Sequence, residues 1–174
     1  TPTRAPSPTS AGMRTEQTIS VWQNRVRMRV LSDGQCPALV YCHGPWGLNW
    51  GPFLSELAKS FTVYAPEHPG TSPGAHDDIY HLDGLWDLVL CYDELLTALK
   101  LEEVAMVGHS FGGLVARLYA SRYPADLAGL VLLDPAARED WRSPSDERRA
   151  RLARGVALCR YGQRAARLRT TDLR

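Results

Sequence analysis

Short runs of apolar residues alternate along this chain with segments whose apolar residues recur every three or four positions, as on one face of a helix. The clearest runs lie at 38–42, 61–65, 104–107 and 130–133, and turn-forming residues bound them. Apolar runs without polar alternation are typical of strands that are covered on both faces. We therefore predict an α/β fold, with a mostly parallel sheet and helices on both of its faces.

The remaining elements follow from the same periodicities. A polar break between two alternating stretches predicts a hairpin of strands at 18–22 and 25–31. Helices are expected around 53–58, along a long apolar stripe from Leu82 to Leu99, and over 114–123, before a proline.

Charge divides the chain unevenly. Residues 1–137 hold 9 basic and 14 acidic side chains, whereas residues 138–174 hold 11 arginines and 5 acids. A basic tail can contact nucleic acid, but this one offers only Trp141 and Tyr161 for stacking on bases, so we expect a solvated helix face and no nucleic-acid partner. We divide the chain into a disordered leader rich in Pro, Thr and Ser (1–17), a core (18–137) and this tail.

Two function classes are disfavoured by composition. No stretch of eighteen apolar residues is present, so we expect no membrane span. The four cysteines form no C-x-x-C pair, which argues against a zinc site or a disulfide framework and favours a reducing, cytoplasmic setting. His76, Asp77, Asp78 and His81 would allow a metal site, but a hydrated loop before the long helix explains them better.

The sequence G-H-S-F-G-G at 108–113 follows one predicted strand and precedes a predicted helix. G-x-S-x-G between a strand and a helix is typical of a nucleophile elbow, a strained turn that exposes the serine hydroxyl. Ser110 is therefore the candidate nucleophile, and the backbone N–H of Phe111, at the positive end of the helix dipole, is a candidate oxyanion donor. The alternative is a tight turn in which Ser110 only caps the helix.

A second motif, C-H-G-P-W-G at 42–47, follows another predicted strand. With this motif, the elbow and the order of elements, residues 18–137 resemble the α/β-hydrolase superfamily. The segment P-E-H-P-G at 66–70 is similar to a loop of its epoxide-hydrolase, haloperoxidase and meta-cleavage hydrolase branch. A serine at the elbow argues against the dehalogenase and epoxide-hydrolase chemistries, whose nucleophile is a carboxylate.

The resemblance implies that the His-Gly loop supplies the second oxyanion donor. Pro45 has no N–H, so the donor would be Trp46 or Gly47. Trp46 would also form a wall of the acyl pocket or, alternatively, pack on the edge of the core. His43, Gly44 and His109 are expected in the substrate pocket.

The catalytic triad is incomplete in this sequence. The family order is serine, acid, histidine, and none of the five histidines follows Ser110. Asp134 ends the last predicted strand and is the candidate acid, with a plain strand-ending turn as the alternative. His68 is a remote candidate for a substitute base. We expect the chain to lack the last two strands of the family plan, with no strand in the tail.

The tail then has two interpretations. It is the start of a helical cap, beginning near Ser143 and Pro144, or an extension outside the genuine fold.

We expect a serine hydrolase that cleaves a small ester or a related acyl bond, including a carbon–carbon bond, through an acyl-enzyme on Ser110. No metal or organic cofactor is implied, and the expected partner is a small-molecule substrate. One alternative is a non-catalytic binding module that lacks the catalytic histidine, and another is a chain too incomplete to fold stably. Nothing in the sequence indicates the oligomeric state.

Overall fold

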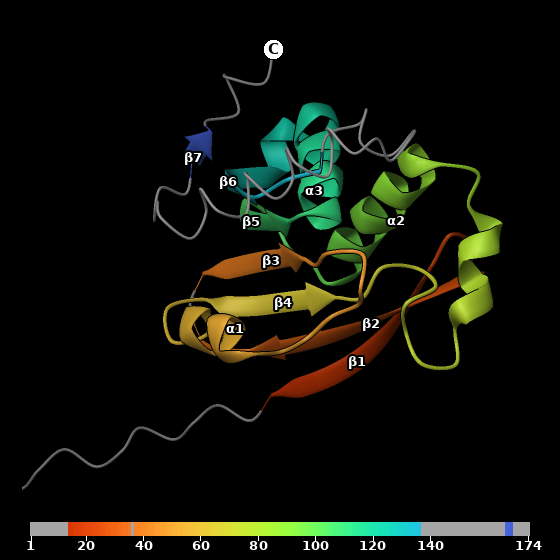
Figure 1. The fold of residues 1–174 in the computed structure, drawn as a ribbon, viewed down its shortest axis with the longest axis horizontal. Coiled ribbons are helices and arrows are strands. Elements are labelled where there is room, and N and C mark those ends of the chain that lie inside the picture. Colours follow the sequence, from red (N-terminus) through yellow and green to blue (C-terminus); the bar gives the residue numbers. More distant parts are fainter. Residues whose placement is uncertain (1–13, 36, 137–165, 169–174) are drawn as a thin grey trace, which may run out of the picture.

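The computed structural model describes residues 14–35, 37–136 and 166–168, which form one twisted sheet with helices packed against it (Figure 1). The strand order across the sheet is β1-β2-β4-β3-β5-β6-β7. The strands are β1 (Thr15–Val21), β2 (Val26–Asp33), β3 (Ala38–Cys42), β4 (Thr62–Pro66), β5 (Val104–His109), β6 (Leu127–Leu133) and β7 (Ala166–Leu168).

The four central strands, β4, β3, β5 and β6, run parallel to one another. On one side β1 and β2 form an antiparallel hairpin that joins β4, and on the other β7 pairs antiparallel with β6. The predicted α/β class is confirmed. The tail does hold one strand, contrary to our expectation: β7 spans three residues of an arginine-rich segment whose apolar pattern is too thin to indicate a strand.

Helices cover both faces of the sheet. They are α1 (Pro52–Leu57), α2 (Leu85–Ala98) and α3 (Phe111–Arg122), with short 3-10 helices η1 (His76–His81) and η2 (Pro124–Asp126). Successive strand residues point to opposite faces. In β3, Val40 therefore packs in the core shared with α2 and α3, whereas Leu39 packs with Leu54 of α1.

The first strand begins earlier than we expected. Residues 15–17, expected in the leader, belong to β1, where the Thr15 hydroxyl lies 2.8 Å from that of Ser32 in β2. Because β1 is the edge strand, its first residues are exposed and polar, so no apolar alternation marks them. Residues 1–13 of the expected leader, and the expected cap start near Ser143, lie outside the described residues.

Within the described ranges, no helix has both the length and the apolar character needed to cross a membrane.

Candidate functional site

Ser110 sits alone between the end of β5 and the start of α3. Its backbone has φ 52° and ψ −116°, a combination that a residue with a side chain rarely adopts. Strain of this kind is typical of functional turns, and a sharp strand-to-helix turn presents the serine at the carboxyl edge of the parallel strands. The structure thus has the sharp strand-to-helix turn that the sequence predicts at Ser110.

The glycines around Ser110 are required by close backbone packing. A Cβ on Gly108 would lie 2.5 Å from the carbonyl oxygen of Gly112. A Cβ on Gly112 would collide with the carbonyl oxygen of Cys42 and lie 2.5 Å from that of His43. Helix α3 therefore begins directly against the end of β3, and only glycine allows that approach.

Backbone hydrogen bonds tie Ser110 to the segment after β6. Its N–H donates to the carbonyl oxygen of Leu133 over 3.0 Å, and its own carbonyl oxygen accepts from the N–H of Ala136 over 2.9 Å. Asp134, between these two partners, has a left-handed φ of 45°. The structure thus brings the candidate acid and the candidate nucleophile to the same edge of the sheet.

The His-Gly loop passes on the other side of Ser110. A Cβ on Gly44 would lie 3.6 Å from the Ser110 Cβ and 3.4 Å from Nδ1 of His109. Segments 42–47 and 108–112, far apart in the sequence, are therefore in van der Waals contact. The two segments expected to hold the oxyanion donors therefore lie beside one another.

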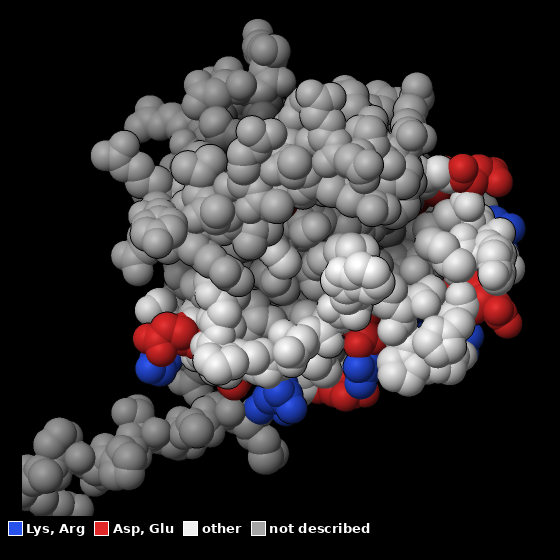
Figure 2. Space-filling view, in the orientation of Figure 1, with Lys and Arg blue, Asp and Glu red and all other residues white. Residues whose placement is uncertain are grey.

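Trp46 projects from this loop into solvent. Its side chain is 97% exposed, so the alternative that it packs on the edge of the core is wrong. In the view of Figure 2, the charged side chains of the described surface lie along its lower edge and on its right side. The role of Trp46 as an oxyanion donor or as a wall of the acyl pocket stays a prediction.

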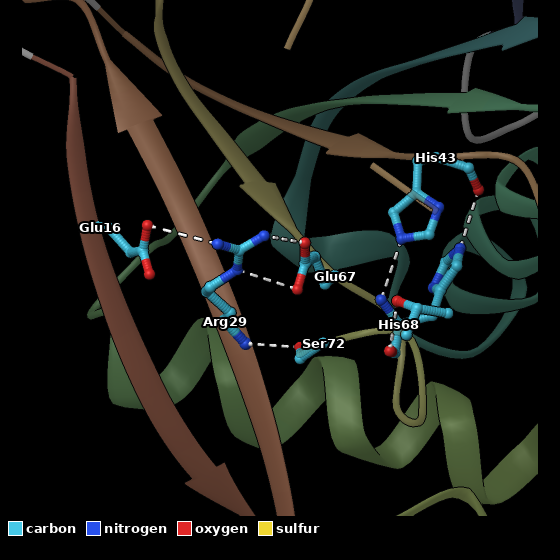
Figure 3. A network of polar contacts seen from close by, with 7 residues as sticks. Glu16, Arg29, His43, Glu67, His68 and Ser72 are labelled. Carbon is cyan, nitrogen blue, oxygen red and sulfur yellow. Dashed lines mark hydrogen bonds and ion pairs between the residues drawn. The ribbon is translucent and has the colours of Figure 1, made fainter. Parts of the chain in front are cut away.

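His43, by contrast, is buried, and both nitrogens of its ring are hydrogen-bonded to backbone groups. Its Nδ1 lies 2.5 Å from the carbonyl oxygen of Gly44, and its Nε2 accepts the backbone N–H of His68 over 3.0 Å (Figure 3). We assign His43 to holding the loop, and the substrate contact expected for it stays a prediction. His109 is exposed beside Gly44, which leaves it accessible to a ligand.

His68 is not a substitute base. It is buried, its Nε2 lies 2.8 Å from the carbonyl oxygen of His43, and its Nδ1 lies 2.8 Å from the hydroxyl of Tyr92. Burial, followed by the neighbouring His43, lowers the pKa of His68 to about 3. Burial also lowers the pKa of His43. Both rings are neutral and fully engaged near pH 7.

A second buried polar group lies beside this pair. Arg29 of β2 donates to the two carboxylate oxygens of Glu67, at 3.0 and 2.5 Å, and also contacts Glu16 (Figure 3). Its backbone N–H reaches the hydroxyl of Ser72 over 3.3 Å. These contacts fix the loop after β4, on which His68 stands.

Tyr92 is the residue of this region that sequence reasoning did not single out. It was one member of the apolar stripe of α2, yet its buried hydroxyl bonds His68. A tyrosine inside such a stripe is itself a signal, since a buried phenol requires a polar partner.

The segment around η1 is also different from the expected hydrated loop. The carboxylate of Asp78 is buried and accepts the backbone N–H and two guanidinium N–H groups of Arg27. These bonds hold the pKa of Asp78 below its ordinary value. Across the described ranges, no group of three or more His, Cys, Asp or Glu side chains is arranged to hold a metal ion.

Comparisons with known proteins agree with this geometry. The family model described as the alpha/beta hydrolase fold matches residues 37–169. A 2-hydroxymuconate semialdehyde hydrolase of a Pseudomonas species is 38% identical over 119 residues, which cover 64% of this chain and 41% of that protein. A pimeloyl-[acyl-carrier protein] methyl ester esterase of Aeromonas hydrophila is 33% identical over 117 residues, covering 62% of this chain and 43% of the relative.

Among solved structures, naproxen esterase (carboxylesterase NP) from Bacillus subtilis has a similar fold. The TM-score is 0.62 at 22% identity, and the match covers 72% of this chain and 44% of that one. The chain thus spans less than half the length of these three proteins.

Proposed function

This chain belongs to the α/β-hydrolase fold family, and from that premise we propose that Ser110 is the nucleophile of a serine hydrolase. The observation that carries the proposal is the strained backbone of Ser110, at φ 52°, with the His-Gly loop so close that a Cβ built on Gly44 would lie 3.6 Å from the Ser110 Cβ. A hydroxyl held at this turn is positioned to attack a carbonyl group.

The proposed reaction is acyl transfer. The Ser110 oxygen bonds to the carbonyl carbon, its proton passes to a general base, and the leaving group departs with a proton returned by that base. Water then attacks the acyl-enzyme and releases the acid. The developing oxyanion would be stabilised by backbone N–H groups of Phe111 and of Trp46 or Gly47, helped by the positive end of the α3 dipole.

Asp134 is the proposed acid that orients the base. Its support is positional, because Leu133 and Ala136, which flank it closely, both bond the backbone of Ser110. The base itself is a histidine in relatives of this fold, placed after the acid, and no histidine of this sequence follows Ser110. The described residues therefore supply the nucleophile and the oxyanion groups but not the base.

The proposed substrate is a small ester or a related acyl compound. The relatives include an esterase and a semialdehyde hydrolase, which support ester hydrolysis and leave carbon–carbon bond hydrolysis as its variant. We propose no cofactor, because acyl transfer at a serine needs none.

A second candidate function is favoured by the exposure of the residues beside Ser110, since Trp46 is 97% exposed and His109 is exposed. The same loop and elbow would form the ligand pocket of a non-catalytic binding module. Such a module binds a small acyl compound whether or not Ser110 carries its hydroxyl.

Covalent labelling separates the two functions. In a protein that also supplies the general base, we expect a fluorophosphonate probe to modify the Ser110 peptide, and Ser110→Ala to abolish the modification. Ser121→Ala is the matched control, because Ser121 is an exposed serine on the same helix, α3. Absence of any adduct, together with ester binding that Ser110→Ala leaves unchanged, would support the binding module instead.

A further inference from the structure

The buried contacts among His43, His68 and Tyr92 determine which ring nitrogens carry protons. A backbone N–H can only donate, and that of His68 donates to Nε2 of His43. Nε2 of His43 is therefore unprotonated, and the proton of that ring is on Nδ1. A carbonyl can only accept, so Nε2 of His68 carries a proton toward the carbonyl oxygen of His43. Nδ1 of the neutral His68 ring then accepts the hydroxyl proton of Tyr92.

These bonds form a directed series from α2 to the His-Gly loop. Tyr92 donates to His68, His68 donates twice to His43, and His43 donates from Nδ1 to the carbonyl oxygen of Gly44. Each of the two neutral imidazoles both donates and accepts, and no described buried side-chain nitrogen or oxygen lacks a partner. The series therefore has one arrangement of protons.

His68 also contacts the other side of the elbow. Its ring lies edge-on to that of Phe111, with centroids 5.2 Å apart and planes at 82°. It stacks at a tilt on His43, with centroids 4.0 Å apart. One side chain thus touches the residue that follows Ser110 and the loop that faces Ser110.

The outer part of the His-Gly loop has little packing of its own, since the Trp46 side chain is 97% exposed. Pro45 offers no N–H, so an oxyanion donor from this loop must lie at Trp46 or beyond. The orientation of that donor depends on how firmly the preceding residues, His43 and Gly44, are held.

From this geometry we infer that His68 is a positioning residue for both halves of the oxyanion hole, fixing the His-Gly loop through His43 and contacting Phe111 directly, with Tyr92 fixing His68 in turn. This inference rests on the proposed function, because it assigns His68 to the same reaction at Ser110. Both ring nitrogens of His68 are bonded within the protein, so its proposed effect on the reaction acts through other residues.

The first test is the rate of Ser110 labelling by the fluorophosphonate in four variants. His68→Leu removes both side-chain hydrogen bonds, and we expect the maximal labelling rate to fall by about 10- to 100-fold while the probe's binding constant changes by less than about twofold. His68→Gln keeps a donor toward His43 and should recover much of the rate. Two variants are controls. His81→Leu makes the same change on an exposed ring, and Val26→Ala weakens the hydrophobic core at the start of β2.

A labelling rate in His68→Leu equal to that of the unsubstituted chain would overturn the inference. An equal slowing in Val26→Ala, at the same loss of stability, would also overturn it, because the effect would then be general. Slowing confined to His68→Leu, with rescue in His68→Gln, supports it.

The second test does not require a reactive serine. Nitrogen-15 NMR should show the proton of His43 on Nδ1 and that of His68 on Nε2. Backbone order parameters of Trp46 and Gly47 should fall from about 0.85 toward 0.6 in His68→Leu and not in His81→Leu. If Ser110 is never labelled, the proposed function fails while this measurement still decides the role of His68, and unchanged order parameters would refute that role.

Discussion

The carbonyl oxygen of Ser110 accepts a hydrogen bond from the backbone N–H of Ala136 over 2.9 Å. The N–H of Ser110 donates to Leu133 over 3.0 Å, so the turn at the end of β5 is clamped by the strand end beside it. Ser110 and Asp134 both adopt a left-handed φ, at 52° and 45°. Two adjacent strand ends thus hold residues with positive φ, and the hydrogen bonds between them stabilise both turns.

Asp134→Asn tests the proposed acid. Asparagine tolerates a left-handed φ, so this change removes the charge without adding backbone strain. We expect the labelling rate of Ser110 to fall by about 10²- to 10⁴-fold in a protein that supplies the base, with little change in stability. Asp83→Asn, on an exposed carboxylate, is the control. If Asp134 is only a turn residue, the two variants will label at the same rate.

Gly112→Ala tests the contact between α3 and the His-Gly loop. The added methyl group would collide with the carbonyl oxygen of Cys42, so we expect the free energy of unfolding to fall by about 1–3 kcal/mol or more. Gly129→Ala is the matched control, because a Cβ there meets no atom within 4 Å. Urea unfolding of both variants measures the difference, and equal stabilities would show that the predicted collision does not occur.

The buried histidines predict a pH-dependent stability. The pKa of His68 is about 3 in the folded protein and 6.5 as its ordinary value, so the unfolded chain binds a proton that the folded chain excludes within that range. Stability should therefore fall as pH decreases from about 6.5, by up to about 1.4 kcal/mol per pH unit for each proton. Asp78 contributes at lower pH. Its ionised carboxylate stabilises the folded protein, and this contribution is lost only as the pH falls below the ordinary pKa of 3.8.

Urea titrations at several pH values between about 7 and 4.5 measure this slope. His68→Gln should make it shallower by about one proton, with His76→Gln as the control for changing an exposed imidazole. A slope that His68→Gln leaves unaltered would contradict a buried neutral His68.

Trp46→Ala separates a ligand contact from a structural one. The side chain is 97% exposed, so the free energy of unfolding should change by less than about 0.5 kcal/mol. If Trp46 forms a wall of the acyl pocket, the dissociation constant of the fluorophosphonate should rise on the order of tenfold. The maximal labelling rate should be kept, because the backbone N–H of the alanine still donates. Trp86→Ala, on α2, should leave probe binding unchanged, and an equal loss of binding in both variants would argue against the pocket.

The central strands, the long helix and the elbow were predictable because their signals are local. A strand buried on both faces must be apolar along its whole length, as in β3, whose predicted and observed bounds coincide. The elbow is equally local, since Gly108 and Gly112 are required wherever a serine occupies so tight a turn.

The sequence patterns did not predict features that depend on solvent exposure or on contacts between residues far apart in the chain. The first residues of β1 are polar because an edge strand faces solvent, and the buried Asp78 is indistinguishable in sequence from a solvated acid. Its burial depends on Arg27, 51 positions earlier.

The sequence by itself determined the α/β class, the strained turn at Ser110 and the glycines that permit it, since each depends on neighbouring residues and on steric limits of the backbone. Only the tertiary structure decided what the histidines do. His43 and His68 are 25 positions apart, and their rings meet because β3 and β4 lie side by side in the sheet. Burial lowers the pKa of both rings, and their hydrogen bonds run to backbone groups of the two loops and to Tyr92.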